Sequence, residues 1–300
     1  MFYALWINRS TLLNLKNPGA AAAYGALAAV AFAAIVFISA FAWKLTLQFL
    51  YGKRIYYRQV RGVYAKSNIA KYLPGNVMHF AGRNVLGGKF GFSQFDMALS
   101  TIIEVLTLLI TAVGWSLALA YSEFFRAVSA SLQKVREATG GLFPLAAAGV
   151  ALLIAAAVFA LLFYARRKGL LLQLRKLFTL SFLKVFAELI GIYSVTMLLP
   201  GFTLVMIFAK VMGVAVSAHG AVIIVTGYLL SWAVGYIVPV SGGLGVREFV
   251  EYLIIGTVCP EGVTVVAVIL LRVASILGDV LAFAGELGIE RFRGKEEENA

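Results

Sequence analysis

The chain has 300 residues, of which 61% are hydrophobic and 13% are charged, and its mean hydropathy is +0.90. A soluble globular domain is about half apolar and about a quarter charged, so this composition excludes an ordinary soluble domain and indicates a membrane protein. Lys and Arg, 26 in number, outnumber the 14 Asp and Glu residues. The basic residues are confined to short stretches between apolar runs, which favours an anionic membrane surface over nucleic acid as their partner.

Residues typical of metal or disulfide chemistry are scarce. Cys259 is the only cysteine, which excludes a disulfide framework and a thiolate metal site. His79 and His219 are isolated in the sequence, and we expect neither a metal ion nor a cofactor. The first ten residues, MFYALWINRS, lack the basic start and apolar run of a cleavable signal peptide, and we expect none there.

Apolar runs predict a series of membrane segments, each of about 20 residues where it crosses the bilayer. The predicted segments are residues 20–43, 95–121, 142–164, 180–211, 219–238, the short run 249–258, and 263–289. We therefore expect an all-α, polytopic bundle, with residues 1–300 forming a single transmembrane domain of about 6–8 membrane segments.

The distribution of basic residues predicts the orientation of these segments. Residues 44–89 contain nine Lys or Arg and no acid, and residues 166–184 contain six and no acid. The positive-inside rule places both regions in the cytoplasm, with residues 121–141 and the start of the chain outside. Residues 291–300 then form a short, charged cytoplasmic tail. We expect a multi-pass protein of the cell (inner or plasma) membrane.

Two segments differ from ordinary spans. Residues 55–75 are too polar to cross alone and end in Pro74-Gly75, and the span 219–238 runs into a Pro- and Gly-rich stretch, residues 239–245. Pro and clustered Gly free backbone groups that are costly at membrane depth unless protein or water satisfies them. Both segments are therefore predicted to be re-entrant or broken helices.

The two breaks resemble each other in the order of their residues. In each, Pro and Gly precede an arginine, Arg83 or Arg247, and a span with one central charge follows, Glu104 or Arg272. Paired broken helices at corresponding positions of two halves mark the binding site in transporters built from repeats. The pattern predicts a pseudo-symmetric repeat in which residues 71–83 and 238–248 pack near each other.

The last predicted span carries three charges on one face. Arg272, Asp279 and Glu286 are seven residues apart, a spacing that aligns them along a helix. A charge at the bilayer centre costs about 2.5–3.5 kcal/mol, so Arg272 needs a partner or water. Glu104 is the expected counter-charge to Arg272, Arg83 or Arg247. The stripe is either a structural ion-pair surface or part of a polar pathway.

The most informative local motif for a binding site is the stretch Pro239-Val-Ser-Gly-Gly-Leu-Gly-Val-Arg-Glu248. Gly242, Gly243 and Gly245 permit a tight turn whose backbone N–H groups can converge on an anion, and the helix that follows would direct its positive end there. Arg247 adds a planar, bidentate donor suited to phosphate. Together these features predict a site for a phosphate head group.

These motifs also resemble a known family. SGGLGVRE at residues 241–248 resembles the PGGLGVRE signature of the lysylphosphatidylglycerol synthase transmembrane (flippase-like) family, with Ser241 in place of the usual Pro. KYLPGNVMHFAGR at residues 71–83 is similar to that family's first-half motif, and the likeness extends from about Asn17 to Ile289. The family usually has one more span before this point, of which FYALW would be the remnant. In one branch such a domain flips aminoacylated phosphatidylglycerol made by a separate synthase domain, which we expect this protein to lack.

Motifs and resemblance together give a candidate set for head-group binding. It comprises Arg83, Glu104, Gly242, Gly243, Gly245, Arg247, Glu248 and Arg272, with Lys71, Pro74, Gly75 and Asp279 in support. We expect a lipid flippase-like protein rather than an enzyme, with membrane phospholipids and anionic head groups as partners, and no nucleic acid. A second copy or a partner synthase would be its protein partner.

Two other functions stay open. A membrane-embedded transferase acting on a lipid or polyprenyl phosphate would usually display clustered acids for metal–diphosphate chemistry, but Asp occurs only at Asp96 and Asp279. No P-loop, HExxH or GxSxG motif is present either. A partner subunit of such an enzyme is the third reading.

Overall fold

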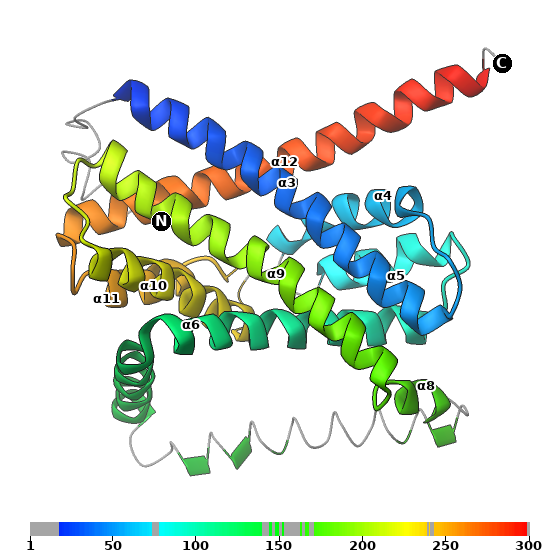
Figure 1. Ribbon diagram of the computed structural model, residues 1–300, viewed down its shortest axis with the longest axis horizontal. Coiled ribbons are helices and arrows are strands. Elements are labelled where there is room, and N and C mark those ends of the chain that lie inside the picture. The colour runs from blue at the N-terminus through cyan, green and yellow to red at the C-terminus, as the bar shows by residue number, and fades with distance from the viewer. Residues whose placement is uncertain are drawn as a thin grey trace. The chain divides into compact units, whose positions relative to one another are not determined.

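The computed structural model describes residues 18–73, 78–139, 171–238, 240 and 243–298, together with residues 144–145, 148–149, 152, 163 and 166–167. Within these residues every regular element is a helix, and Figure 1 shows them coloured in chain order. The predicted all-α fold class is confirmed for the described part of the chain.

Five helices among the described residues are long and apolar enough to cross a membrane. They are α3 (Pro18–Tyr51), residues Gln94–Ser122 of α6 (Gln94–Thr139), α9 (Leu180–Met206) with the π-helical η3 (Ile207–Val211), α10 (Ala218–Ile237), and Glu261–Phe292 of α12 (Glu261–Glu298). The shortest of them, α10, has 20 residues, enough to traverse about 30 Å of hydrocarbon. The chain is therefore a multi-pass membrane protein.

The remaining named helices are too short to cross a bilayer. They are α4 (Tyr57–Asn68), the 3₁₀-helix η1 (Ile69–Tyr72), α5 (Met78–Gly88), α8 (Leu171–Lys176) and α11 (Val246–Ile255). Along α4 the apolar side chains Val60, Val63 and Tyr64 are buried while Arg58 is exposed. This amphipathic pattern explains how so polar a segment stays helical against the bundle.

Several predicted boundaries differ from the observed ones. The first span was expected to end at residue 43, but α3 continues to Tyr51. The predicted short span 249–258 corresponds to α11, whose 10 residues end at Ile255 and do not cross. The predicted tail 291–300 begins inside α12, which stays helical to Glu298. The predicted span 142–164 lies mostly outside the described residues.

The chain divides into two compact units. Residues 1–120 and 188–300 form the first, and residues 121–187 form the second. The division falls at a kink in α6, where Ala120 leaves helical geometry with φ −148° and ψ 65°. The second unit holds the end of α6, α8 and the start of α9. All residues of the candidate site belong to the first unit.

Helices α3 and α12 pack directly against each other, and Figure 1 shows them crossing. Gly278 permits this approach, because a Cβ atom there would lie 2.4 Å from Cβ of Phe32 and 2.6 Å from the carbonyl oxygen of Ala29. Small residues allow close helix contact in membranes, where packing rather than the hydrophobic effect holds helices together. The crossing fixes the charged face of α12 against α3 and α4.

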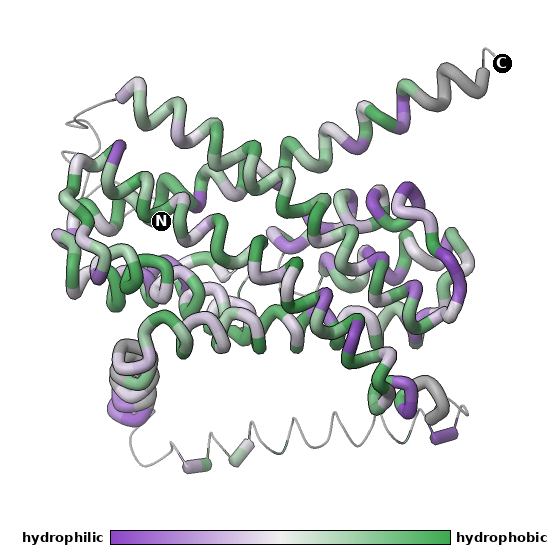
Figure 2. The backbone as a smooth tube through the Cα atoms, viewed as in Figure 1, coloured by the Kyte–Doolittle hydropathy of each residue, from purple (hydrophilic) through white to green (hydrophobic). Residues whose placement is uncertain are grey.

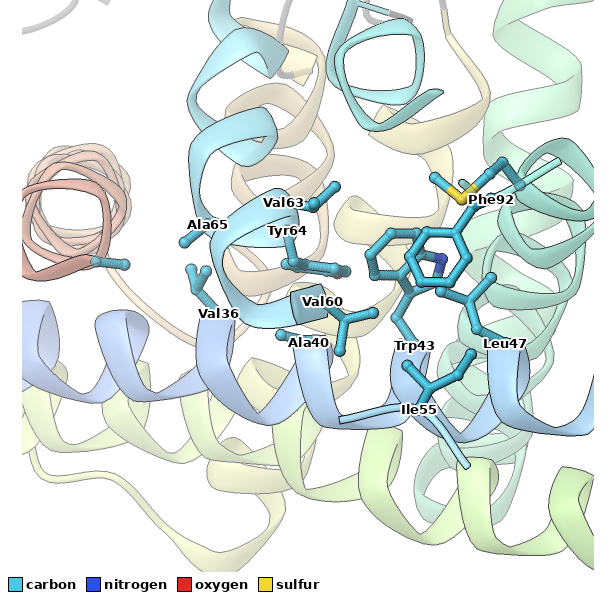
Figure 3. Packing of buried hydrophobic residues seen from close by; sticks show 12 residues of the cluster. Val36, Ala40, Trp43, Leu47, Ile55, Val60, Val63, Tyr64, Ala65 and Phe92 are labelled. Carbon is cyan, nitrogen blue, oxygen red and sulfur yellow. The ribbon is translucent and has the colours of Figure 1, made fainter. Parts of the chain in front are cut away.

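A hydrophobic cluster lies between α3, α4 and the start of α6. Figure 3 shows Trp43 beside Tyr64 in its middle, and their ring centroids are 5.9 Å apart. The indole N–H of Trp43 donates a hydrogen bond to Ser100 on α6 at 2.9 Å. Figure 2 shows hydrophobic residues along the long helices and hydrophilic ones around α4 and the segment that joins it to α3.

The Gly278 contact generates a stability prediction. Gly278→Ala should destabilise the protein by about 1–3 kcal/mol, the usual range for an overpacked site, because the methyl group meets backbone atoms of α3. Gly285→Ala on the same helix is the matched control, since nothing lies within 4 Å of its Cβ position. That change should be neutral or stabilising, by up to about 1 kcal/mol. Thermal unfolding in detergent measures both, and equal midpoints for the two variants would contradict the packing argument.

Candidate functional site

The charged stripe predicted on the last span lies on the buried face of α12. Arg272, Asp279 and Glu286 are 9%, 5% and 2% exposed. This face meets α3, α4, η1 and α11. Because buried charges are costly at membrane depth, the partners of each residue decide what the stripe does.

Helices α4 and η1 supply the partners of both carboxylates. Arg61 pairs with Glu286 through Nε and Oε2 at 2.6 Å. Lys71 pairs with Asp279 through Nζ and Oδ2 at 2.7 Å, and the amide of Asn68 donates to the other oxygen, also at 2.7 Å. Tyr72 donates a further hydrogen bond to Asp279. Short polar helices that could not cross a membrane alone are thereby attached to a spanning helix.

Arg83 and Glu104 form an ion pair in the interior of the first unit. Arg83 is 2% exposed and Glu104 1%. The hydroxyl of Tyr64 donates to the other oxygen of Glu104 at 2.7 Å, and the Arg83 guanidinium lies 3.9 Å from the centroid of the Tyr64 ring. Of the three counter-charges considered for Glu104, the structure selects Arg83.

Arg247 projects from the first turn of α11 and is only partly buried. Its guanidinium lies 5.5 Å from the centroid of the Trp232 ring. Two glycines make room for its side chain, since a Cβ atom at Gly235 or at Gly243 would lie 2.9 Å or 2.8 Å from its Nε. That Nε atom is buried, and no hydrogen-bond acceptor meets it within the described residues. Arg247 also has no carboxylate partner in this part of the chain.

The glycine turn differs from the predicted anion cradle. The backbone N–H of Gly245 donates to the carboxylate of Glu248 at 2.6 Å, and the N–H of Gly243 donates to the carbonyl of Val240 at 2.8 Å. Both donors are therefore engaged within the protein. Gly243 and Gly245 have φ values of 69° and 85°, so they permit the turn. Of the two, Gly243 also leaves room for the Arg247 side chain.

The charged side chains converge on one cavity of about 140 Å³, called here the polar cavity. Its charged lining residues are Lys71, Arg83, Glu104, Arg247, Arg272 and Asp279. Four cations and two carboxylates thus face the same space. Both repeated motifs contribute, residues 71–83 through Lys71 and Arg83 and residues 238–248 through Arg247.

Glu248 and His79 modify this charge balance. Oε1 of Glu248 lies 3.4 Å from Nε of Arg272, an ion pair longer than a normal hydrogen bond. His79 also lines the polar cavity. Burial, with Arg83 and Lys71 adding to it, lowers the pKa of His79 to about 3, so its ring is neutral at physiological pH. The cavity keeps an excess of positive charge.

A small recess of about 30 Å³ adjoins the polar cavity and shares Arg247 and Arg272 with it. Glu248 and Glu251 complete its charged lining. Glu251 is 5% exposed, and the hydroxyl of Ser231 donates to it at 2.7 Å. The recess therefore brings two arginines and two glutamates from α11 and α12 into one small volume.

The candidate residues from the sequence fall into three groups. Those that line the polar cavity are Lys71, Arg83, Glu104, Arg247, Arg272 and Asp279, and those near it on α11 or its preceding turn are Gly243, Gly245 and Glu248. The remaining three, Pro74, Gly75 and Gly242, lie outside the described residues.

Sequence reasoning missed Tyr64, Asn68 and Tyr72, which bind the two buried carboxylates of the cavity. A signal for them existed, because residues four apart lie on one helical face and all three are polar in a segment already identified as unusual. It also missed Trp232 and Tyr236, which line the polar cavity from α10.

No family model, curated protein or solved structure matches this chain. The resemblance to the flippase-like family therefore stays a prediction.

The Arg83–Glu104 pair leads to a prediction about stability. Arg83→Met should destabilise the protein by about 3–5 kcal/mol, because it leaves the buried Glu104 carboxylate without its counter-charge. The double variant Arg83→Met, Glu104→Gln should recover much of that loss, since the amide oxygen can still accept from Tyr64. Arg58→Met, at an exposed position of α4, is the control. Thermal unfolding is the measurement, and a single variant as stable as the wild type would rule out a structural role for the pair.

Proposed function

We propose that this protein is a flippase-like membrane protein that binds the head group of an anionic phospholipid in the polar cavity and carries it across the bilayer. The support is the charge of the cavity, where four cationic side chains and two carboxylates line about 140 Å³ between apolar helices. Cationic charge in excess at membrane depth is costly unless water or an anion compensates it. A phosphate group would supply that compensation.

The main support for the proposal is the buried Nε of Arg247, which has no acceptor among the described residues. The guanidinium is planar, partly buried and held against Trp232. An Arg fork matches two phosphate oxygens, and such charge-assisted hydrogen bonds are about twice as strong as neutral ones. A buried donor left without an acceptor is therefore best explained by an anionic ligand.

Arg272 and Lys71 are proposed as the secondary donors. Both line the polar cavity, and each is paired with a carboxylate near its edge, Glu248 and Asp279 respectively. Arg83 is a weaker candidate than the sequence indicated, because Glu104 neutralises it and Tyr64 covers it. The proposed site thus depends on Arg247 first, Arg272 and Lys71 next, and Arg83 as a structural support.

We also propose that α4 with α5, and α10 with α11, form two re-entrant hairpins that approach the cavity from opposite sides of the membrane. In each pair the helices pack against each other, and at least one is too short to span. Lys71 and Arg247, which lie near the two breaks in the sequence, both line the polar cavity. A pseudo-two-fold relation between these hairpins would follow the plan of repeat-built transporters.

The resemblance of residues 241–248 and 71–83 to the flippase-like family supports the same function, in the cell membrane. The likeness includes Arg247 and Arg83, two of the three arginines that line the polar cavity. It gives no head group for this chain. The anionic class of the lipid is inferred from the charge of the cavity.

The hairpin proposal predicts the accessibility of loops. In a Cys259→Ala background, single cysteines at Lys53 and Lys89 should react with an impermeant maleimide from the same side, because they flank α4 and α5. Cysteines at Ala215 and Glu261, which flank α10 and α11, should both react from the opposite side. Labelling of intact and permeabilised cells distinguishes the sides. Opposite sidedness within either pair would contradict the hairpins, and for Ala215 and Glu261 it would show that α10 crosses the membrane.

The function itself is tested by lipid scrambling. In proteoliposomes with fluorescent phosphatidylglycerol, Arg247→Gln should slow scrambling roughly tenfold or more, because one charge-assisted contact of about 1.5–3 kcal/mol is lost. Arg247→Lys keeps the charge but loses the fork, and should also be slowed. Arg58→Gln, which removes a positive charge from an exposed position, should scramble at the wild-type rate.

Two results would contradict the proposal. Equal rates for wild type and both Arg247 variants, at matched protein levels, would remove Arg247 from the mechanism. No scrambling by the wild type, with any head group tried, would favour a transferase or a partner subunit.

A further inference from the structure

An apolar groove lies between α11 and α12. It has a volume of about 230 Å³ and is lined by Glu248, Phe249, Tyr252, Val265, Val268 and Ile269. Glu248 contributes the only charge among these residues, and the others offer aliphatic or aromatic surface. We call this feature the acyl groove. Its lining differs from that of the polar cavity, which has six charged residues.

The acyl groove adjoins the head-group site through shared lining residues. Glu248 and Val268 line both the groove and the small recess. Arg247 and Arg272 line both the recess and the polar cavity. An amphiphile could therefore have its charged end at the two arginines and its apolar end along α11 and α12.

One wall of the groove lies at the surface of the protein. Phe249, which forms one wall, is 54% exposed, and Val258 beyond the end of α11 is 36% exposed. In a multi-pass membrane protein, exposed apolar side chains contact acyl chains. A chain from the surrounding lipid can reach the groove without crossing a polar surface, so the groove has a source for its occupant.

We propose that the acyl groove holds one acyl chain of the lipid whose head-group phosphate binds at Arg247 and Arg272. This inference rests on the proposed function of the polar cavity and adds a substrate class to it, a lipid whose phosphate lies next to its acyl chains. Oε1 of Glu248 lies 3.4 Å from Nε of Arg272, where the groove meets the recess. A phosphate oxygen arriving there can form the closer contact with the guanidinium.

In a membrane, the head group and the acyl chain of the bound lipid contribute differently to its binding. An acyl chain gains little by moving from lipid into an apolar groove, because the two surroundings are equally apolar. The phosphate of the head group, in contrast, can form charge-assisted hydrogen bonds with the two guanidinium groups, which an uncharged lipid cannot form. Occupancy of the groove should therefore depend on the head group, although the groove itself touches only the chain.

Photolabelling tests this dependence. Proteoliposomes would contain phosphatidylglycerol or diacylglycerol, each with the same diazirine on one acyl chain, and labelled peptides of α11 and α12 would be quantified. The phosphatidylglycerol-to-diacylglycerol ratio at the groove should exceed the ratio at Leu106 and Ile110 of α6 roughly tenfold. Those reference residues are exposed, at 53% and 51%, and lie outside the groove.

Two variants locate the effect. Arg247→Gln should reduce the ratio at the groove to that of the reference residues, because the head group loses its anchor. Val265→Trp should fill the groove and reduce labelling of Phe249 and Tyr252 by phosphatidylglycerol, whereas Val280→Trp, at an exposed position of α12, should not. If Val265→Trp fails to fold, the wild-type ratio and Arg247→Gln still decide the matter.

The outcomes separate this inference from the proposed function. A groove ratio equal to the reference ratio in the wild type, or unchanged in Arg247→Gln, overturns the acyl groove, and a helix of a second copy then becomes the better occupant. Selective labelling that depends on Arg247, combined with no scrambling, upholds the acyl groove and contradicts transport. Loss of scrambling in Arg247→Gln without selective labelling upholds transport and overturns the acyl groove.

Discussion

Compensation of charge inside an apolar bundle is the constraint on which the rest of this structure depends. Helix α12 is long and hydrophobic enough to cross a membrane, yet its buried face carries Arg272, Asp279 and Glu286. None of these side chains is tolerable against lipid, so α12 requires polar neighbours. Helices α4 and η1 meet that requirement for both carboxylates, and α11 meets it for Arg272 through Glu248. Ion pairs with the charged residues of α12 thus hold α4, η1 and α11 in place.

Glycines give these charged contacts the space they need. Gly278 lets α12 approach α3 closely enough to enclose the stripe, and a Cβ atom at Gly62 would lie 3.2 Å from a carboxylate oxygen of Glu286. Gly235 and Gly243 do the same around Arg247. The glycines of residues 242–245 were predicted to bind an anion through their N–H groups, but two of those groups have partners within the turn. Their contribution is to the shape of the site, and the cationic side chains supply its charge.

The sequence predicted those features that depend on periodicity, and failed where the outcome depends on approach in space. Apolar length located the five described spans, and seven-residue spacing aligned the charges of α12. The choice of Arg83 as partner of Glu104, and of Lys71 as partner of Asp279, depends on how α4 and α5 pack, which no local pattern specifies. Helix ends were also misplaced, as at Tyr51, because polar residues can extend a helix beyond the apolar run that identifies it.

The arginines differ in whether a carboxylate neutralises them, and this difference helps to distinguish structural arginines from candidates for ligand binding. Arg61 and Arg83 each have a carboxylate within hydrogen-bond reach, so the fold itself explains their presence. Arg247 has no such carboxylate among the described residues. Glu251 lies four positions later on the same helix, a spacing at which the two side chains could pair. The Glu251 carboxylate instead accepts a hydrogen bond from Ser231. For an arginine with a purely structural role, an ion pair with Glu251 would be stabilising. An arginine without such a partner that lines a cavity suits the anion binding proposed here, since a permanent internal partner would compete with every such ligand.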